Sequence, residues 1–529
     1  MNRSKKHRGW VLNTLGEATY NERTLGAGIL MKALPTLLFC LAGLLASASG
    51  FRQPDDLAAM SQRAKEFMAE GKFADAVPLY RELNQAVPNN PGLLLNLGMA
   101  LHMAGDERKS ITQLEAAVKL DPKLAPAWLF LGAARLQLGQ TPAAVDALKT
   151  VLRLQPDHRD ALDMLAGALE SLGRAVEAAE QYQRLADLAP ESSLAWYGLG
   201  RSYESLSVRA FDDLQKAAPE SAYWLALVAE TRLRELQFSS AFYLYRRALE
   251  KMPAMRGLHA QVAEVYRRTG HPDWASLEEQ KEQPLTEPDC HSQTLECQFR
   301  EEHFLGLLAS ANGTNTPESY YWRSRAYNEL ALQAFARLGQ LPPSTEQHEL
   351  KAHIFIGQKR YADAAQEWRE AFKLSPLDKQ IQKQLAISLK FSQDYAGALP
   401  LLQGLLHGQP ASAELNYLTG ETLLDLQRAE EAIPLLRHAV ERDPKLVGAH
   451  KALARGYLAA GKARDAIPHL KAALAADEDG SLHYQLARAY QVTGQPGLAK
   501  EMLADYEKTQ RSAAEATETA RRDVEITPP

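Results

Sequence analysis

The sequence predicts an all-α fold, a solenoid of stacked helix-turn-helix units, because two series of residues recur with one period. Prolines repeat at intervals of 34 residues almost throughout, at Pro88, Pro122, Pro156, Pro190, Pro219, Pro253, Pro343, Pro376, Pro410 and Pro444. A second series, of small residues, keeps the same period, at Ala76, Ser110, Ala144, Ala178, Ala241, Ala364, Ala398, Ala432, Ala466 and Ala499. Each stands twelve positions before the proline of its repeat, wherever the repeat has one. Self-similarity at this period is typical of units that cannot bury their apolar faces alone and therefore stack.

The unit that begins at Ala125 shows what each position requires. Trp128 and Leu131, at positions 4 and 7 of the unit, are three residues apart and share one face of a first helix. Leu148, at position 24, lies on the inner face of a second helix. Gly132, at position 8, lets the two helix axes approach closely, so large and small residues alternate across the interface.

Glycines and prolines mark where each helix begins and ends. A left-handed residue ends a first helix at little cost, which predicts the turn glycines Gly71, Gly105, Gly139, Gly173 and Gly461. The recurrent prolines end the second helix, since proline cannot donate an amide hydrogen. A further set follows the small residue by two positions and is expected in the first turn of the second helix, where the amide has no acceptor: Pro78, Pro400, Pro434 and Pro468.

This pattern resembles the tetratricopeptide repeat over most of residues 57 to 505. The resemblance implies a right-handed superhelical solenoid whose first helices line a concave groove. In this register, full-length units start at Leu57, Pro91, Ala125, Arg159, Ala222, Thr345, Lys379, Ala413 and Val447, and shorter ones near Ser193, Arg256, Pro317 and Gly480. Repeats of this family serve as scaffolds in many unrelated processes, so the resemblance specifies the fold more than the function.

The N-terminal region, residues 1–48, is interpreted as an extension followed by an export signal. An apolar run from Leu34 to Leu45 follows Met31 and Lys32 and precedes a small-residue triplet of the kind that signal peptidase accepts. The run is shorter than the roughly 20 residues that span a bilayer. We therefore predict a periplasmic or secreted protein without a membrane span in the mature chain; an anchor through residues 34–48 is the alternative.

The rest of the chain is predicted to form two repeat arrays, residues 57–283 and 317–505. Between them, residues 284–316 are rich in turn-forming residues and are interpreted as a loop or linker. Residues 506–529 are polar and predict an end helix and a tail. The segment at 201–206 recurs at 325–330 with an offset of 124, and both copies lack the turn glycine. This duplication predicts two variant units with a short or fused helix pair.

Two cysteines, Cys290 and Cys297, remain after cleavage of the signal. In an exported chain a disulfide between them is expected, because thiols persist poorly in an oxidising compartment. Zinc is the alternative, since His291 and His303 flank the pair, although the spacing fits no standard Cys-x2-Cys site.

The sequence offers no catalytic motif and implies no cofactor. It has no glycine-rich phosphate loop and no nucleophile elbow, and its charges of both signs are interspersed with a net charge of -5, so nucleic acid is not an expected partner. His348 and His353 are five residues apart, whereas a metalloprotease helix places two histidines four apart on one face. We predict packing or surface roles for both and no enzymatic activity.

Groove positions 2, 5, 9, 12 and 13, carried over from the resemblance, select the candidate partner-binding residues Leu95, Met99, His102, Met103, Leu129 and Leu136. Methionine and leucine surfaces repack around hydrophobic segments, which suits an apolar peptide or partner helix. The alternative is that neighbouring repeats already cover these side chains. The family's carboxylate-binding mode is not expected, because Pro126 and Phe130 stand where lysine and arginine are needed.

Further along the groove the same positions carry charges, and Lys451 and Arg455 lie beside Glu414 and Glu421 of the preceding unit. We expect a solvated or mutually paired surface there and no anion site. The first functional hypothesis is an exported scaffold that binds a protein or peptide. The second is an accessory subunit of an envelope enzyme or polysaccharide system, with catalysis on another chain.

Overall fold

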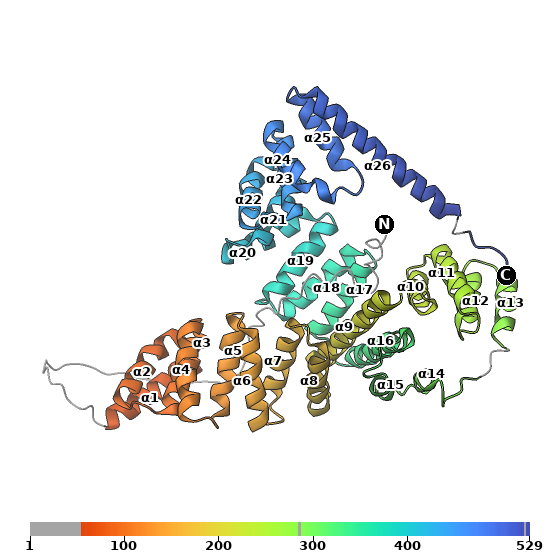
Figure 1. Ribbon diagram of the computed structural model, residues 1–529. Helices are drawn as coiled ribbons and strands as arrows, with labels where there is room; N and C mark the ends of the chain where they lie inside the picture. The colour runs from red at the N-terminus through yellow and green to blue at the C-terminus, as the bar shows by residue number, and fades with distance from the viewer. Residues whose placement is uncertain (1–53, 284–286, 523–524) are drawn as a thin grey trace. The chain divides into compact units, whose positions relative to one another are not determined.

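The computed structural model describes residues 54–283, 287–522 and 525–529, which contain 26 α-helices, one short 3-10 turn at Leu474–Ala476 and no strand (Figure 1). The predicted all-α repeat fold is confirmed. The predicted export signal lies outside the described residues. None of the helices in the described part of the chain is both long and apolar enough to cross a membrane.

Compact packing divides the described residues into two units, 54–206 with 331–341, and 207–330 with 342–529. The division passes through two long helices and not through residues 284–316, where the sequence suggested a boundary between arrays. The first unit contains α1 (Pro54–Ala69), α2 (Phe73–Ala86), α3 (Pro91–Met103), α4 (Glu107–Leu120), α5 (Ala125–Gln137), α6 (Thr141–Leu154), α7 (Arg159–Ser171), α8 (Ala175–Leu188) and the start of α9 (Ser193–Ala217).

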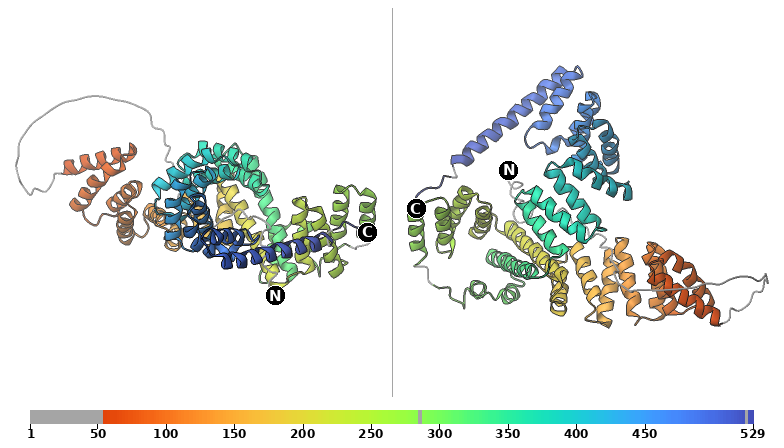
Figure 2. Two further views of the ribbon diagram at one scale, coloured as in Figure 1. Left: turned by 90° about the horizontal axis from the view of Figure 1, so that it is seen from above. Right: turned by 180° about the vertical axis from the view of Figure 1, so that it is seen from behind.

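The second unit continues with helix pairs of the same kind, which follow a curved path from α17 to α24 (Figure 2). Its helices are α10 (Ala222–Arg234), α11 (Phe238–Lys251), α12 (Leu258–Arg268), α13 (Pro272–Glu282), α14 (Thr294–Arg300), α15 (Phe304–Ser310), most of α16 (Pro317–Gly339), α17 (Thr345–Gly357), α18 (Tyr361–Leu374), α19 (Lys379–Phe391), α20 (Tyr395–Gly408), α21 (Ala413–Asp425), α22 (Ala429–Arg442), α23 (Val447–Ala459), α24 (Ala463–Ala473), α25 (Ser481–Val492) and α26 (Pro496–Arg522).

The turn between the two helices of a full-length repeat contains one residue in the left-handed backbone conformation, as the turn glycines predicted. The five predicted turn glycines have φ between 68° and 81°. Four full-length units without a glycine there hold another residue in the same conformation, at Leu236, Lys359, Gln393 and Gln427, with φ between 59° and 67°. A shared turn geometry therefore outweighs the steric preference of the individual side chain.

Glycine at position 8 lies where two helices of one unit approach most closely. A Cβ atom on Gly132 would lie 2.8 Å from Leu148 Cγ, and one on Gly98 would lie 2.6 Å from Leu114 Cγ. Gly420 stands in the same relation to Leu436, at 2.6 Å. The leucines at position 24 thus occupy the space that a side chain at position 8 would need.

The side chain at position 4 connects successive units by a hydrogen bond that sequence reasoning did not find. In four units an indole, amide or imidazole nitrogen at this position lies within bonding distance of the carbonyl oxygen of the proline six residues earlier. The pairs are Trp128 with Pro122 at 3.0 Å, Trp196 with Pro190 at 2.9 Å, Asn416 with Pro410 at 2.9 Å, and His450 with Pro444 at 3.1 Å. The bond satisfies a backbone carbonyl in the short connection between one unit and the next.

The prolines inside the second helices lie further along than predicted. Each is the sixth residue of its helix: Pro78 in α2, Pro400 in α20, Pro434 in α22 and Pro468 in α24. The expectation of a first-turn position was therefore wrong. All four prolines are exposed, and so are the residues four positions before them, so water can bond the carbonyl that loses its helical partner.

The duplicated variant units are each one long helix, α9 and α16, where the other units have a pair. The two helices meet at small side chains. Ser207 Oγ donates to the carbonyl of Ser324 at 2.8 Å, and Ser324 Oγ lies 3.2 Å from the carbonyl of Ser207; both serines are buried. Nearer the start of α9, a Cβ on Gly200 would lie 2.3 Å from the Phe335 ring. The prediction of fused helix pairs is confirmed.

Residues 284–316, interpreted as a loop or linker, contain the two short helices α14 and α15. Their formation follows from apolar burial, because Cys297, Phe304 and Leu307 are buried. Arg256 also binds α14 by donating two hydrogen bonds of 2.6 Å to the Glu296 carboxylate. Turn-forming residues stand at both ends of the segment, so its composition did not predict the two helices at its centre.

Candidate functional site

The six candidate groove residues lie on α3 and α5, the first helices of two consecutive units, and all six are partly buried. Three of them also contribute to the core. Leu95 packs against the cluster that includes Leu114 and Leu131, and Leu129 and Leu136 pack against the cluster that includes Leu148. The structure thus brings the candidates onto adjacent helices but leaves them only part of their surface for a partner.

The histidine among these candidates has two defined neighbours. His102 Nδ1 lies 2.7 Å from Glu107 Oε2, and its ring meets Phe130 of α5 edge to face, with centroids 6.0 Å apart. Phe130 is itself partly buried and was not among the predicted groove residues. In the sequence, Phe130 stood out only as an obstacle to carboxylate binding, and its contact with His102 now places it beside the candidate residues.

Met99 and Met103 are one helical turn apart on α3, on the same side as His102. Both are partly buried. Flexible thioether side chains adapt their shape to an apolar contact, so these two residues provide the most adaptable part of the candidate surface.

The corresponding positions of α19, α21 and α23 form a network of paired charges. Lys390 Nζ lies 2.9 Å from Glu421 Oε2 and 3.8 Å from Asp425 Oδ2, and Arg455 Nη2 lies 2.9 Å from Asp425 Oδ1. Lys383 pairs with Glu414 at 3.1 Å. These charges are paired, but not with one another as the sequence suggested: Glu414 and Glu421 bind lysines of α19, and Arg455 binds Asp425.

Burial and the neighbouring Glu421 raise the pKa of the Tyr417 phenol well above its usual range, so this groove-facing tyrosine stays neutral. Lys451, the other cation noted in the sequence, donates to the carbonyl of Ala476 at 3.2 Å. Each cation in this stretch therefore has a partner, and the arrangement leaves no built anion site.

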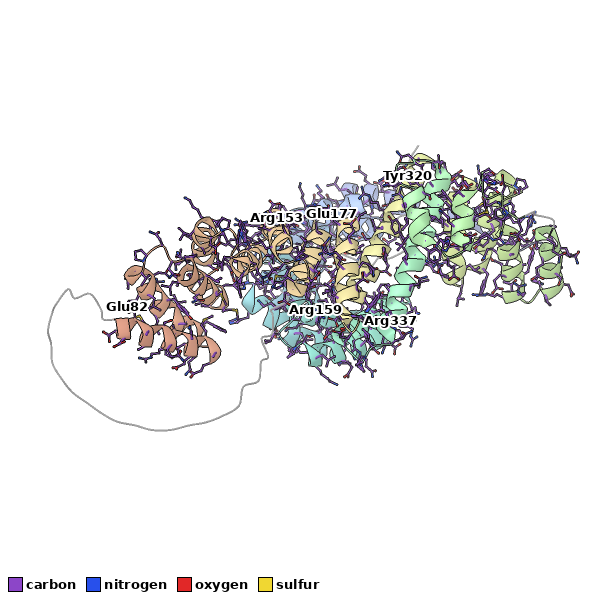
Figure 3. The ribbon with its side chains drawn as sticks, turned by 90° about the horizontal axis from the view of Figure 1, so that it is seen from below. Glu82, Arg153, Arg159, Glu177, Tyr320 and Arg337 are labelled. Carbon is purple, nitrogen blue, oxygen red and sulfur yellow. A yellow bond between two sulfur atoms is a disulfide. The ribbon has the colours of Figure 1, made fainter. Side chains whose placement is uncertain are left out.

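Charge pairs also connect the second helices of the first unit. Glu177 of α8, labelled in Figure 3, accepts hydrogen bonds from Lys149 of α6 at 3.1 Å and from Arg174 Nε at 2.6 Å. The hydrogen bond from Arg174, followed by that from Lys149, lowers the pKa of the Glu177 carboxyl. These contacts lie on other helices than the candidate groove residues.

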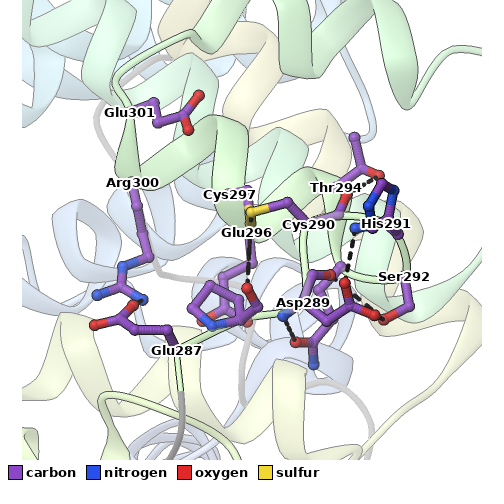
Figure 4. Close-up of a disulfide and its surroundings, with 12 residues drawn as sticks. Glu287, Asp289, Cys290, His291, Ser292, Thr294, Glu296, Cys297, Arg300 and Glu301 are labelled. Carbon is purple, nitrogen blue, oxygen red and sulfur yellow. Dashed lines mark hydrogen bonds and ion pairs between the residues drawn. A yellow bond between two sulfur atoms is a disulfide. The ribbon is translucent and has the colours of Figure 1, made fainter.

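The cysteine pair joins Cys297, within α14, to Cys290 in the turn before it, with the two sulfurs bonded in the structure and the Cα atoms 5.7 Å apart (Figure 4). Asp289 orders the preceding turn by accepting from Ser292 Oγ at 2.9 Å and from the amide of His291 at 3.1 Å. The spacing suits a disulfide. Among the residues that the structure describes, no group of three or more histidines, cysteines and carboxylates is arranged to hold a metal ion.

We expect Cys290 and Cys297 to resist alkylation in the protein purified without reductant, because neither sulfur carries a free thiol. Mass spectrometry after denaturation in excess iodoacetamide should find both unmodified, and both modified once a reductant is added first. A zinc site would give the opposite pattern: the denatured, unreduced chain would take up label at both positions. Any Cys40 retained in the preparation serves as the internal control for labelling.

The two histidines of the near-miss motif have structural neighbours. His348 Nδ1 lies 2.7 Å from Glu367 Oε2, and His353 meets the ring of Trp368 edge to face at 5.3 Å. The two side chains therefore contact different residues of α18 and form no common site.

Comparisons with known proteins find related repeats in several stretches of the chain. Two family models described as tetratricopeptide repeat match the chain, one over residues 129–193 and 383–446 and the other over residues 67–133. A stretch of 80 residues is 32% identical to the "Heat-shock protein cognate (HSC) co-chaperone sgt12" of Aspergillus fumigatus. That match covers 15% of this chain and only 24% of the relative.

Solved structures of repeat proteins are also similar to parts of the chain. A tetratricopeptide repeat protein from Parabacteroides merdae is 14% identical, with a TM-score of 0.31, and the match covers 63% of this chain and 99% of that one. MamA from Desulfovibrio magneticus RS-1 is 19% identical, with a TM-score of 0.27, and the match covers 38% of this chain and 97% of that one.

Proposed function

This chain is a tetratricopeptide-repeat protein, and from that premise we propose that it is a non-enzymatic scaffold that holds a protein or peptide partner against α3 and α5. Arrays of this kind present extended surfaces made from successive first helices. The observation that supports this site is that Met99, Met103 and the neighbouring leucines are only partly buried and lie on two consecutive first helices.

The chemistry of the surface favours an apolar segment as the partner. Thioether, aliphatic and aromatic side chains predominate, and His102 is already paired with Glu107. A partner helix or extended peptide with two or three large apolar side chains would complement it. Recognition through a C-terminal carboxylate is not proposed, because Phe130 occupies a position where a cation would be needed and packs against His102.

We further propose that the scaffold acts outside the cytoplasm. The apolar run and small-residue triplet near the N-terminus support export, and a cysteine pair that bonds in the structure is compatible with an oxidising compartment. The charged groove of α19, α21 and α23 is proposed to contribute solubility and rigidity, with partner binding confined to the apolar stretch.

Photo-cross-linking in cells tests the site and the compartment together. A photoreactive residue at position 99 should attach a defined partner that is recovered with the envelope or periplasmic fraction. The double substitution Met99→Glu and Met103→Glu should then weaken binding of that partner by about 30-fold or more, since the loss of even one hot-spot contact costs about 2 kcal/mol.

The matched control adds the same two negative charges at exposed positions of second helices, with Gln85→Glu on α2 and Thr112→Glu on α4. This control should bind the partner as the unmodified chain does. Equal binding by the Met99 and Met103 variant would contradict the proposed site. Recovery of the cross-linked complex from the cytoplasm would contradict export while leaving the site standing.

A further inference from the structure

The second unit contains a shallow hollow that is separate from the groove of α3 and α5. The turn before α11 and the first residues of that helix form one side, and the end of α12 forms the other. Its volume is about 450 Å³, and it is lined by Leu236, Gln237, Phe238, Ser239, Ser240, Thr269 and Ile526. Small-ligand pockets measure roughly 300–1,000 Å³, so the hollow has room for one or two side chains.

One lining residue comes from a distant part of the chain. Ile526 belongs to residues 525–529, which follow α26, and it is partly buried whereas the other four residues of this segment are exposed. The next residue makes a second contact: Tyr266 Oη of α12 donates to the carbonyl oxygen of Thr527 at 2.7 Å, across 261 positions of sequence. The segment is thus held by an apolar side chain and by a backbone hydrogen bond.

The local structure on both sides favours this contact between Tyr266 and Thr527. The Tyr266 ring is buried and fixed between Phe242, at 5.4 Å between centroids, and Trp274, at 5.6 Å, so its hydroxyl points in a defined direction. In the segment, Pro528 and Pro529 restrict the backbone to extended conformations, and Pro528 disfavours a helical Thr527. An extended backbone leaves the Thr527 carbonyl free to accept.

We propose that this hollow is a second peptide-binding site and that residues 525–529 of the same chain are its ligand. Recognition combines an aliphatic side chain that packs at the wall of the hollow with a tyrosine hydroxyl on the next carbonyl. The contact fastens the polar C-terminal region to α11 and α12. A free peptide with the same features, an aliphatic residue followed by a residue and a proline, is expected to compete with it.

Cross-linking of the full chain tests the proposal. A diazirine analogue of an aliphatic amino acid at position 526 should, on irradiation, attach to the peptides that contain Leu236–Ser240 or Thr269. The experiment uses an equal mixture of isotopically light and heavy chains. Links within one copy support the proposal, whereas links between copies, links to other helices or the absence of any link would overturn it.

Two substitutions test whether the yield of the cross-link depends on the hydrogen bond and on the apolar lining. Tyr266→Phe keeps the ring and removes the donor, and should lower the yield about fivefold, as expected for one lost hydrogen bond. Leu236→Asp changes a residue that is 64% exposed and has φ of 60°, so the fold should tolerate it while the hollow loses apolar surface and the yield falls about tenfold. Tyr243→Phe, which removes a hydroxyl from α11 outside the lining, should leave the yield unchanged. Unchanged yield in both test variants would refute the site.

Discussion

Replacement of Gly132 by valine is expected to lower the free energy of unfolding of the first unit by about 3 kcal/mol. The first added carbon would lie 2.8 Å from Leu148 Cγ, closer than packed side chains come, and Leu148 is fully buried. The helices α5 and α6 must therefore separate. Hydrogen exchange of peptides from these two helices measures the effect directly, because unfolding in a repeat array is local as well as global.

A matched control is Gly357→Val, at the last residue of α17, where an added Cβ would meet nothing within 4 Å. This variant should change stability by about 0.5 kcal/mol or less. In the Gly132→Val background, Leu148→Ala opens space and should cost less than it does in the unmodified chain. If the costs of Gly132→Val and Leu148→Ala were additive, the destabilisation by Gly132→Val would not come from the close approach of Gly132 to Leu148.

Replacement of Ser207 by leucine is expected to cost about 3 kcal/mol or more, because it overfills the place where α9 and α16 meet and removes the hydrogen bond that Ser207 Oγ donates to the buried carbonyl of Ser324. The carbonyl of Ser324 would lose the hydrogen bond from Ser207, and both residues are buried. Hydrogen exchange should accelerate in both helices, although 117 positions of sequence separate the two serines. Thermal unfolding monitored by circular dichroism provides the second readout.

Ser205→Leu introduces the same side chain two residues earlier on α9, at an exposed position, and should leave stability within about 0.5 kcal/mol. If hydrogen exchange in the Ser207→Leu variant became faster in α9 alone, the contact at Ser207 and Ser324 would not be what stabilises α16.

The repeat period predicted much of the fold residue by residue. Of the nine full-length units, eight have a first helix that begins at the residue where the unit was predicted to start, from Pro91 of α3 to Val447 of α23. The reason is physical: a glycine at position 8, a leucine at position 24 and a left-handed turn at position 15 are local requirements, and each leaves a mark in the sequence.

Features that depend on distant residues left no such mark. The helices α14 and α15 are stabilised by the burial of Phe304 and Leu307 and by the contact of Glu296 with Arg256, which no local pattern reveals. The docking of Ile526 beside α11 is hidden for the same reason, since a polar C-terminal sequence reads as a solvated tail. The prolines of α2, α20, α22 and α24 were misplaced by a full turn because their exposure, and not their distance from the helix start, makes them tolerable.

The candidate site could be predicted in part. Groove positions transferred from the repeat register placed six residues on two adjacent helices, and the same register placed the charges of α19, α21 and α23 together. The register gave neither the extent to which Leu129 and Leu136 also serve the core nor the choice of Asp425 as the partner of Arg455. Both depend on side-chain packing that a repeat pattern does not encode.

The meeting of Ser207 and Ser324 has a consequence for the order of folding events. Contacts between adjacent helix pairs close short loops and form rapidly, whereas a contact across 117 positions must wait until the intervening chain is confined. The helix pairs from α10 to α13 should therefore assemble first and bring α9 and α16 within reach of each other. Refolding is then expected to show a fast phase of helix formation and a slower phase in which this crossing closes, and Ser207→Leu should act on the slower one.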